Sequence, residues 1–133
     1  MGIMKEYDCI HCGKHVIKGN TAGKYCSNQC QKNYESNVKT KDWIKNNSKV
    51  GKSIVRKYLI GQHGYCCSVC SLETWMEQPI VLEIDHTDGN AYNNRPNNLR
   101  LICPNCHSQT KTFKNRNKGN GRKLKQHDGW LLV

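Results

Sequence analysis

Apolar residues fall in short, separate segments along this chain, and each segment predicts a small element. In residues 53–60, apolar side chains at positions 54, 55, 58 and 59 share one helical face, which predicts a helix. Ser53 is expected to cap the start of this helix, and Gly61 to end it in a left-handed turn. A second short helix is expected over residues 30–38, with the polar residues 45–48 as a linker.

The second half of the chain has the pattern of two strands and a helix. In the apolar run 79–85, Leu82 and Ile84 are expected on one face and Glu83 and Asp85 on the other. The Asn-rich segment 87–98 predicts a loop, and residues 99–102 predict a second short strand. Pro104 suits a first helical turn, so a helix is expected over residues 105–113. The order strand, loop, strand, helix predicts a small α+β fold.

Composition indicates that metal supports this fold. Of the 133 residues only 36% are hydrophobic, and this share includes nine cysteines and a single Phe. A chain of this size buries a modest core, and structural metal or disulfides compensate in such cases. The N-terminus lacks the pattern of a secretory signal, so we expect reduced cysteines that bind zinc in the cytoplasm. No segment has the length of an apolar membrane span.

The cysteines form two sets of four with the spacing of zinc sites. Two close thiolate pairs supply the four tetrahedral ligands of a structural zinc, which leaves no open position. The first set resembles small treble-clef zinc fingers; it has His11 and His15 as rival ligands and serves either DNA contact or stabilisation. The second set clamps an insert of residues 71–102, and Cys66 is left over as a spare thiol. The two sets are Cys9, Cys12, Cys26 and Cys30, and Cys67, Cys70, Cys103 and Cys106.

Charge points to a polyanionic partner. The formal net charge is +11, and residues 89–127 contain no acidic side chain. Such a one-sign stretch favours nucleic acid, and the missing apolar stripe disfavours a membrane surface. The alternative is a merely solvated basic segment. The candidate nucleic-acid-binding residues are Arg95, Arg100, Lys111, Lys114, Arg116, Lys118, Arg122, Lys123 and Lys125.

The clamped insert resembles the zinc-clamped HNH endonucleases of phages and bacteria, over about residues 57–117. The resemblance rests on several motifs in order: Leu82-Glu83-Ile84-Asp85-His86, Asp88-Gly89-Asn90, Asn93-Asn94-Arg95, Asn98-Leu99-Arg100-Leu101 and Cys103-Pro104-Asn105-Cys106-His107. It implies a ββα-metal fold and hydrolysis of phosphodiester bonds with one divalent ion. By this motif Asp85 and His107 hold the ion, His86 is the general base, and Asn98 braces the loop that aims His86.

The chemistry of these residue types agrees with that resemblance. A divalent ion neutralises the phosphate and stabilises the leaving oxygen, and His titrates near neutrality as a base. Magnesium or manganese is expected, and an imidazole ligand also admits another transition ion. Neighbours on a helix point about 100° apart, so Cys106 can bind zinc while His107 faces the second ion. On a regular strand Asp85 and His86 face opposite ways, so a break of the pleat is expected there.

Simpler readings compete at several positions. His107 could be an alternative zinc ligand, and His86 a packed histidine. Asp88 is expected to be a turn carboxylate rather than a group supporting the site, and Trp75 is expected in the core. Glu83 lies near the site on the Asp85 face without an assigned role.

The sequence thus predicts a metal-dependent DNA endonuclease with two structural zinc ions, acting on duplex DNA as a monomer or a DNA-induced dimer. The expected domains are a zinc finger (1–36), a helical linker (37–62), the nuclease domain (63–117) and a basic tail (118–133). A cytoplasmic location in a bacterial or phage-infected cell follows. The alternatives are a non-catalytic zinc-finger nucleic-acid-binding protein and an RNA-processing nuclease.

Overall fold

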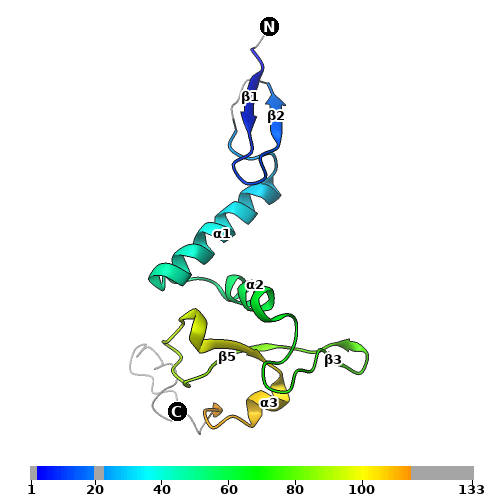
Figure 1. Cartoon of the computed structure of the whole chain (residues 1–133), viewed down its shortest axis with the longest axis vertical. Helices are drawn as coiled ribbons and strands as arrows, with labels where there is room; N and C mark the ends of the chain where they lie inside the picture. Colours follow the sequence, from blue (N-terminus) through cyan, green and yellow to red (C-terminus); the bar gives the residue numbers. More distant parts are fainter. Residues whose placement is uncertain (1–2, 20–22, 115–133) are drawn as a thin grey trace, which may run out of the picture. The chain divides into compact units, whose positions relative to one another are not determined.

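The structure, a computed structural model, describes residues 3–19 and 23–114. The chain divides into two compact units, Met1–Val50 and Gly51–Val133, so the division falls within the predicted linker 37–62. Within the described residues, all elements are short apart from two helices (Figure 1). Each unit contains one set of four cysteines.

The first unit joins a β-hairpin to a long helix. Strands β1 (Lys5–Asp8) and β2 (His15–Lys18) pair antiparallel, with Tyr7 opposite Val16. The Tyr7 hydroxyl donates to the carbonyl of Tyr25 at 3.1 Å, which ties the hairpin to the segment before the helix. This arrangement brings the turn after β1 and the start of the helix together around the first cysteine set.

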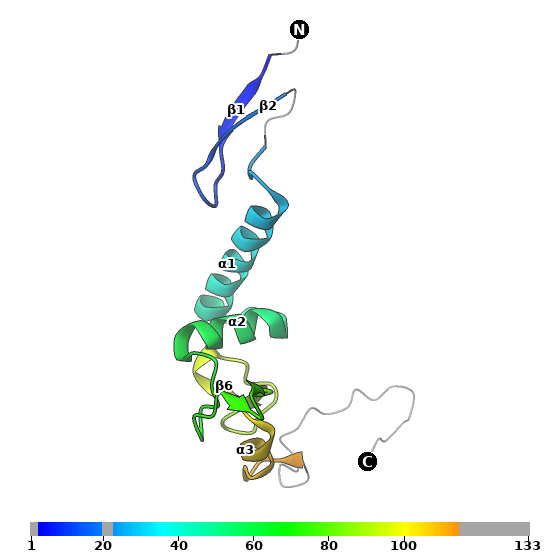
Figure 2. The same cartoon turned by 90° about the vertical axis from the view of Figure 1, so that its right-hand side faces the viewer.

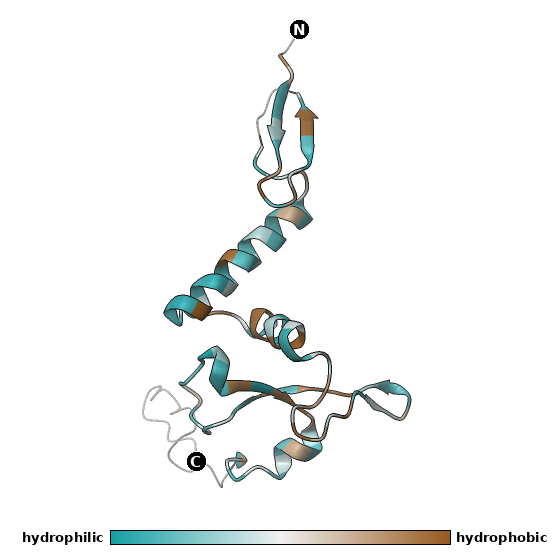
Figure 3. Cartoon of the chain, in the orientation of Figure 1, coloured by the Kyte–Doolittle hydropathy of each residue, from teal (hydrophilic) through white to brown (hydrophobic). Residues whose placement is uncertain are grey.

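Helix α1 (Asn28–Asn46) is much longer than the predicted 30–38, and it includes two residues of the predicted linker. The Ser27 hydroxyl accepts a bond from the Cys30 N–H and caps the start, while Asn47 ends the helix with φ 55°. Side chains four residues apart bond to each other, as between Gln31 and Glu35. Helix α1 is hydrophilic along most of its length (Figure 3), so local bonds of this kind contribute to its stability. The same hydrophilic sequence has little apolar periodicity from which its full length could be predicted.

Helix α2 (Lys52–His63) has the predicted apolar face, with Val55 and Leu59 buried. Both predicted ends are wrong. Gly51 is the N-cap, so Ser53 lies inside the first turn and makes no capping bond. The helix continues through Gly61 and ends at Gly64. Gly64 has a φ of 80°, and its N–H donates to the carbonyl of Ile60.

The predicted strand 79–85 is divided between two different pairings. Strands β3 (Thr74–Trp75) and β4 (Gln78–Pro79) form a hairpin whose turn residues Met76 and Glu77 both have positive φ. Trp75 is 66% exposed on this hairpin, so its predicted place in the core is wrong. The hairpin extends away from α3 in Figure 1, which explains why so large a side chain stays in solvent.

Strands β5 (Glu83–His86) and β6 (Leu99–Ile102) pair antiparallel and are followed by α3 (Pro104–Ser108). The predicted order of strand, loop, strand and helix is confirmed. A 3₁₀ turn, η1 (Pro96–Asn98), interrupts the predicted loop, and α3 ends well before the predicted residue 113. The β5–β6 ribbon lies between α2 and α3, as Figures 1 and 2 both show.

The core of the second unit is small and includes two cysteines. Its buried hydrophobic residues come from α2, β6, the run before β5 and the cysteine positions that follow α2 and β6: Val55, Leu59, Ile80, Leu82, Leu99, Leu101, Ile102, Cys67 and Cys103. Tyr65 and Arg56 donate to the carbonyls of Ile80 and Leu82, which satisfies backbone groups that no strand pairs. No helix in the described ranges is long and apolar enough to cross a membrane.

Candidate metal centres and active site

The first cysteine set converges in the first unit. The sulfurs of Cys9, Cys12, Cys26 and Cys30 all lie within 4.8 Å of one another. The Cys12 and Cys26 sulfurs are 3.6 Å apart, and those of Cys26 and Cys30 are 3.4 Å apart. Four sulfurs each about 2.3 Å from one zinc would lie roughly 3.8 Å apart. This set can therefore hold a metal ion such as zinc; neither His11 nor His15 belongs to it, and His15 instead bonds to Asp8.

The second set has the same geometry in the second unit. Cys67, Cys70, Cys103 and Cys106 also lie within 4.8 Å, and the sulfurs of Cys70 and Cys103 are 3.8 Å apart. Cys66 lies outside the set and contacts the carbonyl of His63. Since the ligands come from the segment after α2 and from the start of α3, a metal ion bound here would hold both ends of the β3–β6 region together.

Backbone N–H groups lower the pKa of one thiol in each set. The N–H of Cys12 donates to Cys9 and lowers its pKa to about 6. Burial raises the pKa of Cys67, but donation from the N–H groups of Cys70 and Cys103 outweighs it and leaves this pKa at about 6. Hydrogen bonding with the Cys26 sulfur raises the pKa of Cys30 to about 12, and burial raises that of Cys106 to about 12. A bound cation would offset the raised pKa values of Cys30 and Cys106, because metal binding favours the thiolate form of all four cysteines.

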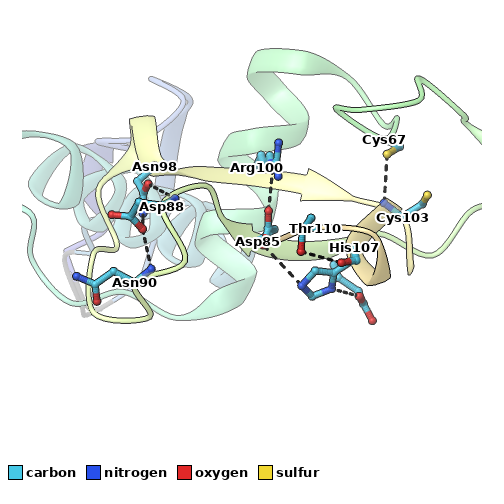
Figure 4. Close-up of polar contacts among 10 residues, drawn as sticks. Cys67, Asp85, Asp88, Asn90, Asn98, Arg100, Cys103, His107 and Thr110 are labelled. Atoms are coloured by element: carbon cyan, nitrogen blue, oxygen red, sulfur yellow. Dashed lines mark hydrogen bonds and ion pairs between the residues drawn. The ribbon is translucent and has the colours of Figure 1, made fainter. Parts of the chain in front are cut away.

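Asp85 and His107 come together from β5 and α3. The His107 Nε2 lies 3.6 Å from the Asp85 Oδ1, and the Asp85 side chain is only 6% exposed (Figure 4). Two ligand atoms that share one ion at about 2.1 Å lie roughly 3 to 4 Å apart, so this pair fits one divalent ion. A carboxylate oxygen and an imidazole nitrogen also have the right chemistry for magnesium, manganese or another transition ion.

Arg100 occupies the other side of the Asp85 carboxylate. It stands directly opposite Asp85 in the β5–β6 ladder, and its Nε donates to Asp85 Oδ2 at 2.8 Å. The sequence grouped Arg100 with the candidate nucleic-acid contacts, whereas its observed partner is this carboxylate. The ion pair leaves only Oδ1 of Asp85 facing His107 (Figure 4).

His86 is the last residue of β5, and its ring bonds to the loop that follows. Its Nε2 lies 2.8 Å from the Asn94 Oδ1. The expected break of the pleat between Asp85 and His86 is wrong, because the ladder continues through both residues, opposite Arg100 and Leu99. The chain turns only afterwards, at Thr87, whose N–H donates to the Asn98 carbonyl.

Asn98 is buried and holds this loop closed. Its Oδ1 accepts from the Asp88 N–H, and its Nδ2 donates to the Asp88 carboxylate and to the Asn93 carbonyl. Asp88 also accepts from the side chain of Asn93 and the N–H of Asn90; these bonds, with that of Asn98, lower its pKa. The expectation of a turn carboxylate at Asp88 is confirmed by its bond from the Asn90 N–H, but through Asn98 it also supports the loop beside His86, which was not expected (Figure 4).

The remaining basic candidates divide by position. Arg95, Lys111 and Lys114 are exposed on the second unit. The others lie outside the described residues: Arg116, Lys118, Arg122, Lys123 and Lys125.

Two contacts at this site could not be found by sequence reasoning alone. Asn94 lies in the Asn93-Asn94-Arg95 motif, and nothing in the loop composition indicates that it reaches His86. Glu83 was noted on the Asp85 face, and its Oε2 lies 2.5 Å from the His107 Nδ1.

Comparison with known proteins finds an endonuclease that is similar to part of the chain. The H-N-H endonuclease F-TflIV of Escherichia phage T5 is 53% identical over 53 residues, which are 40% of this chain and 23% of that protein. This chain therefore spans less than a quarter of the length of that curated relative. No family model and no solved structure matches the chain. A segment of this chain is thus related to an H-N-H endonuclease, and two cysteine groups able to bind metal accompany it.

Proposed function

We propose that this protein is a metal-dependent DNA endonuclease with a ββα-metal site built from β5, β6 and α3. The observation that carries the proposal is the meeting of a buried carboxylate, Asp85, with the ring of His107, beside the strand end that bears His86. The similarity to a phage H-N-H endonuclease supports it independently.

In this proposal Asp85 Oδ1 and His107 Nε2 hold one divalent ion. When bound, that ion supplies positive charge that neutralises the phosphate and stabilises the leaving 3′ oxygen. Two protein ligands are few, so room remains for phosphate oxygens and water. Arg100 supports this arrangement because it binds Oδ2 and leaves Oδ1 for the ion.

His86 acts as the general base, and because the unbroken ladder places Asp85 and His86 on opposite faces of β5, its ring has to reach the ion site from the strand end, where the chain turns at Thr87. The Asn94 Oδ1 accepts a hydrogen bond, so the facing Nε2 of His86 carries the ring proton. The Nδ1 of a neutral ring then has the free lone pair that takes a proton from the attacking water. Asn98 keeps the loop 87–94 closed through Asp88 and Asn93, and so holds Asn94 in reach of His86.

The cysteine sets and basic residues serve binding and stability. Zinc on the second set would fix α3, and hence His107, relative to the segment after α2. Exposed cations such as Arg95 and Lys111 would contact phosphates of a DNA duplex in a bacterial or phage-infected cell.

Plasmid cleavage tests this proposal. The zinc-loaded protein is incubated with supercoiled plasmid, with and without magnesium or manganese, and His86→Ala is compared with His63→Ala. His63 is an exposed histidine at the end of α2, and its replacement should leave cleavage unchanged. Loss of a general base typically costs ~100–10,000-fold in rate, while DNA binding and zinc content should remain.

The main alternative is a non-catalytic zinc-finger protein that binds nucleic acid. A parent protein that retards DNA in gels but cuts neither DNA nor RNA with any divalent ion would establish that alternative. Cleavage confined to RNA would instead identify an RNA-processing nuclease.

A further inference from the structure

Glu83 forms a contact to the candidate ion site that the proposed chemistry has not used. Glu83 and Asp85 lie two residues apart on β5, so their side chains share one face of the strand. Both reach the same ring: the Glu83 Oε2 lies 2.5 Å from the His107 Nδ1, and the Asp85 Oδ1 lies 3.6 Å from its Nε2. The two carboxylates thus contact opposite nitrogens of one imidazole.

This arrangement determines which nitrogen of His107 carries the proton. An ionised carboxylate can only accept hydrogen bonds, so the Nδ1 that faces Glu83 must be the donor. In a neutral ring the lone pair is then on Nε2, the nitrogen beside Asp85. With the tautomer reversed, a proton would stand where the ion has to bind.

Packing around the ring supports this orientation. The Phe113 ring contacts His107 edge-on, with centroids 5.4 Å apart. The Thr110 hydroxyl donates to the His107 carbonyl at 2.9 Å. These contacts restrict the turn that carries the ring, but neither reaches a ring nitrogen by hydrogen bonding. The Glu83 contact distinguishes Nδ1 from Nε2 in favour of ion binding.

We propose that Glu83 is a positioning residue that fixes the Nδ1–H tautomer of His107 and so presents Nε2 to the ion. The inference rests on the proposed function for its purpose, but the tautomer can be measured whether or not the protein cuts DNA. Metal-binding histidines generally donate their second ring N–H to a carboxylate or carbonyl, and loss of that partner typically costs about 10–100-fold in metal affinity.

Three variants of the full, zinc-loaded chain separate hydrogen bonding from charge. Glu83→Ala removes the acceptor, and Glu83→Gln keeps an acceptor oxygen without the charge. Glu73→Ala is the matched control, since Glu73 is an exposed acid of the same unit, next to β3. Calorimetry measures the affinity for manganese alone, and nitrogen-15 NMR of the histidine rings assigns the tautomer in the manganese-free protein.

We expect Glu83→Ala to bind manganese about 10–100-fold more weakly than Glu73→Ala and to lose the Nδ1–H tautomer of His107. Glu83→Gln should keep the tautomer and bind within a few-fold of the parent. Zinc content and circular dichroism report whether Glu83→Ala folds. If it does not, Glu83→Asp is tested in its place, because the shorter Asp side chain holds the carboxylate one methylene further from the His107 Nδ1.

An unchanged tautomer and an affinity within twofold of Glu73→Ala would overturn the inference. So would a Glu83→Gln variant as weak as Glu83→Ala, because charge alone would then explain the loss. A parent protein that has the expected tautomer but never cleaves DNA would contradict the proposed function and leave the role of Glu83 intact.

Discussion

Replacement of Arg100 by Ala should destabilise the β5–β6 ribbon rather than weaken DNA binding. Arg100 stands opposite Asp85 in the ladder and donates to its carboxylate at 2.8 Å. The Asp85 side chain is 6% exposed, whereas that of Arg100 is 31% exposed. Removal of the guanidinium therefore leaves a buried carboxylate without its main partner, and water can reach it only in part.

The size of this effect follows from the burial of the pair. Two unit charges 4 Å apart attract by about 4 kcal/mol at an effective dielectric constant of 20. Water reaches the guanidinium and competes for it, so the net loss is smaller. Leaving a buried group unsatisfied costs about 1–3 kcal/mol, and we expect about 2 kcal/mol here. This corresponds to a roughly 30-fold rise in the opening equilibrium of the ribbon.

Amide hydrogen exchange in β5 and β6 measures that opening in the second unit alone. Arg95→Ala is the matched control, because it removes the same group from an exposed position of the loop. Protection should fall roughly 30-fold in Arg100→Ala and remain unchanged in Arg95→Ala. The reasoning is refuted if the protection is equal in both variants while Arg100→Ala flattens the salt dependence of DNA binding by about 0.9, the signature of a lost phosphate contact.

Three further outcomes are expected. Purified protein should contain two zinc ions per chain by elemental analysis, and Cys103→Ser should lose one of them and unfold the second unit, whereas Cys66→Ser should retain both. Truncation after Phe113 should weaken DNA binding, and the slope of log affinity against log salt concentration should flatten by about 0.9 per lost phosphate contact. An unchanged slope would mean that the basic tail is solvated and does not contact phosphates. At low protein concentration, supercoiled plasmid should become open circles before linear DNA, since one set of site residues acts on one strand; a rate that rises with the square of concentration would instead indicate a dimer.

Local spacing predicted the metal-binding part of this molecule well. Ligand pairs such as Cys67 and Cys70 are close in sequence, and tetrahedral coordination leaves few ways to join two such pairs. The alternation of residues 82–85 also placed Glu83 and Asp85 on one face, because a strand has a period of two. Both inferences rest on the spacing of residues that are close in the sequence, so neither requires knowledge of which strands pair.

The features that the sequence missed or misplaced depend on contacts between distant residues. Arg100 meets Asp85 only because the β5–β6 register sets them opposite each other, and composition cannot give a register. Trp75 was expected in the core, but it stands next to a two-residue turn with positive φ on a hairpin that the core does not cover. Helix α1 was underestimated since its cap and polar side-chain pairs produce no apolar stripe.

The loop that holds His86 should loosen in acid, and Asp88 is the group responsible. Hydrogen bonds from the Asn93 side chain, the Asn90 N–H and the Asn98 side chain lower the pKa of Asp88 below its usual value of 3.8. A carboxyl with a lowered pKa in the folded state stabilises the fold above its unfolded pKa, and this contribution disappears as the pH falls through the folded pKa.

Asp88→Asn should therefore destabilise the loop 87–94 at pH 6, and its difference from the parent should shrink as the pH falls below about 4. Amide exchange at Asn90 and Asn98, compared between the two proteins from pH 6 to pH 3, measures this. Asn98→Ala removes its bond to the Asp88 carboxylate together with two neutral bonds, to the Asp88 N–H and the Asn93 carbonyl, so it should show the larger loss at pH 6 and only a partial convergence with the parent in acid. A difference between parent and Asp88→Asn that stays constant down to pH 3 would mean that the Asp88 charge contributes nothing to the loop. The position of Asn94, and with it the proton of His86, would then depend on neutral bonds such as those of Asn98 to the Asn93 carbonyl and the Asp88 N–H.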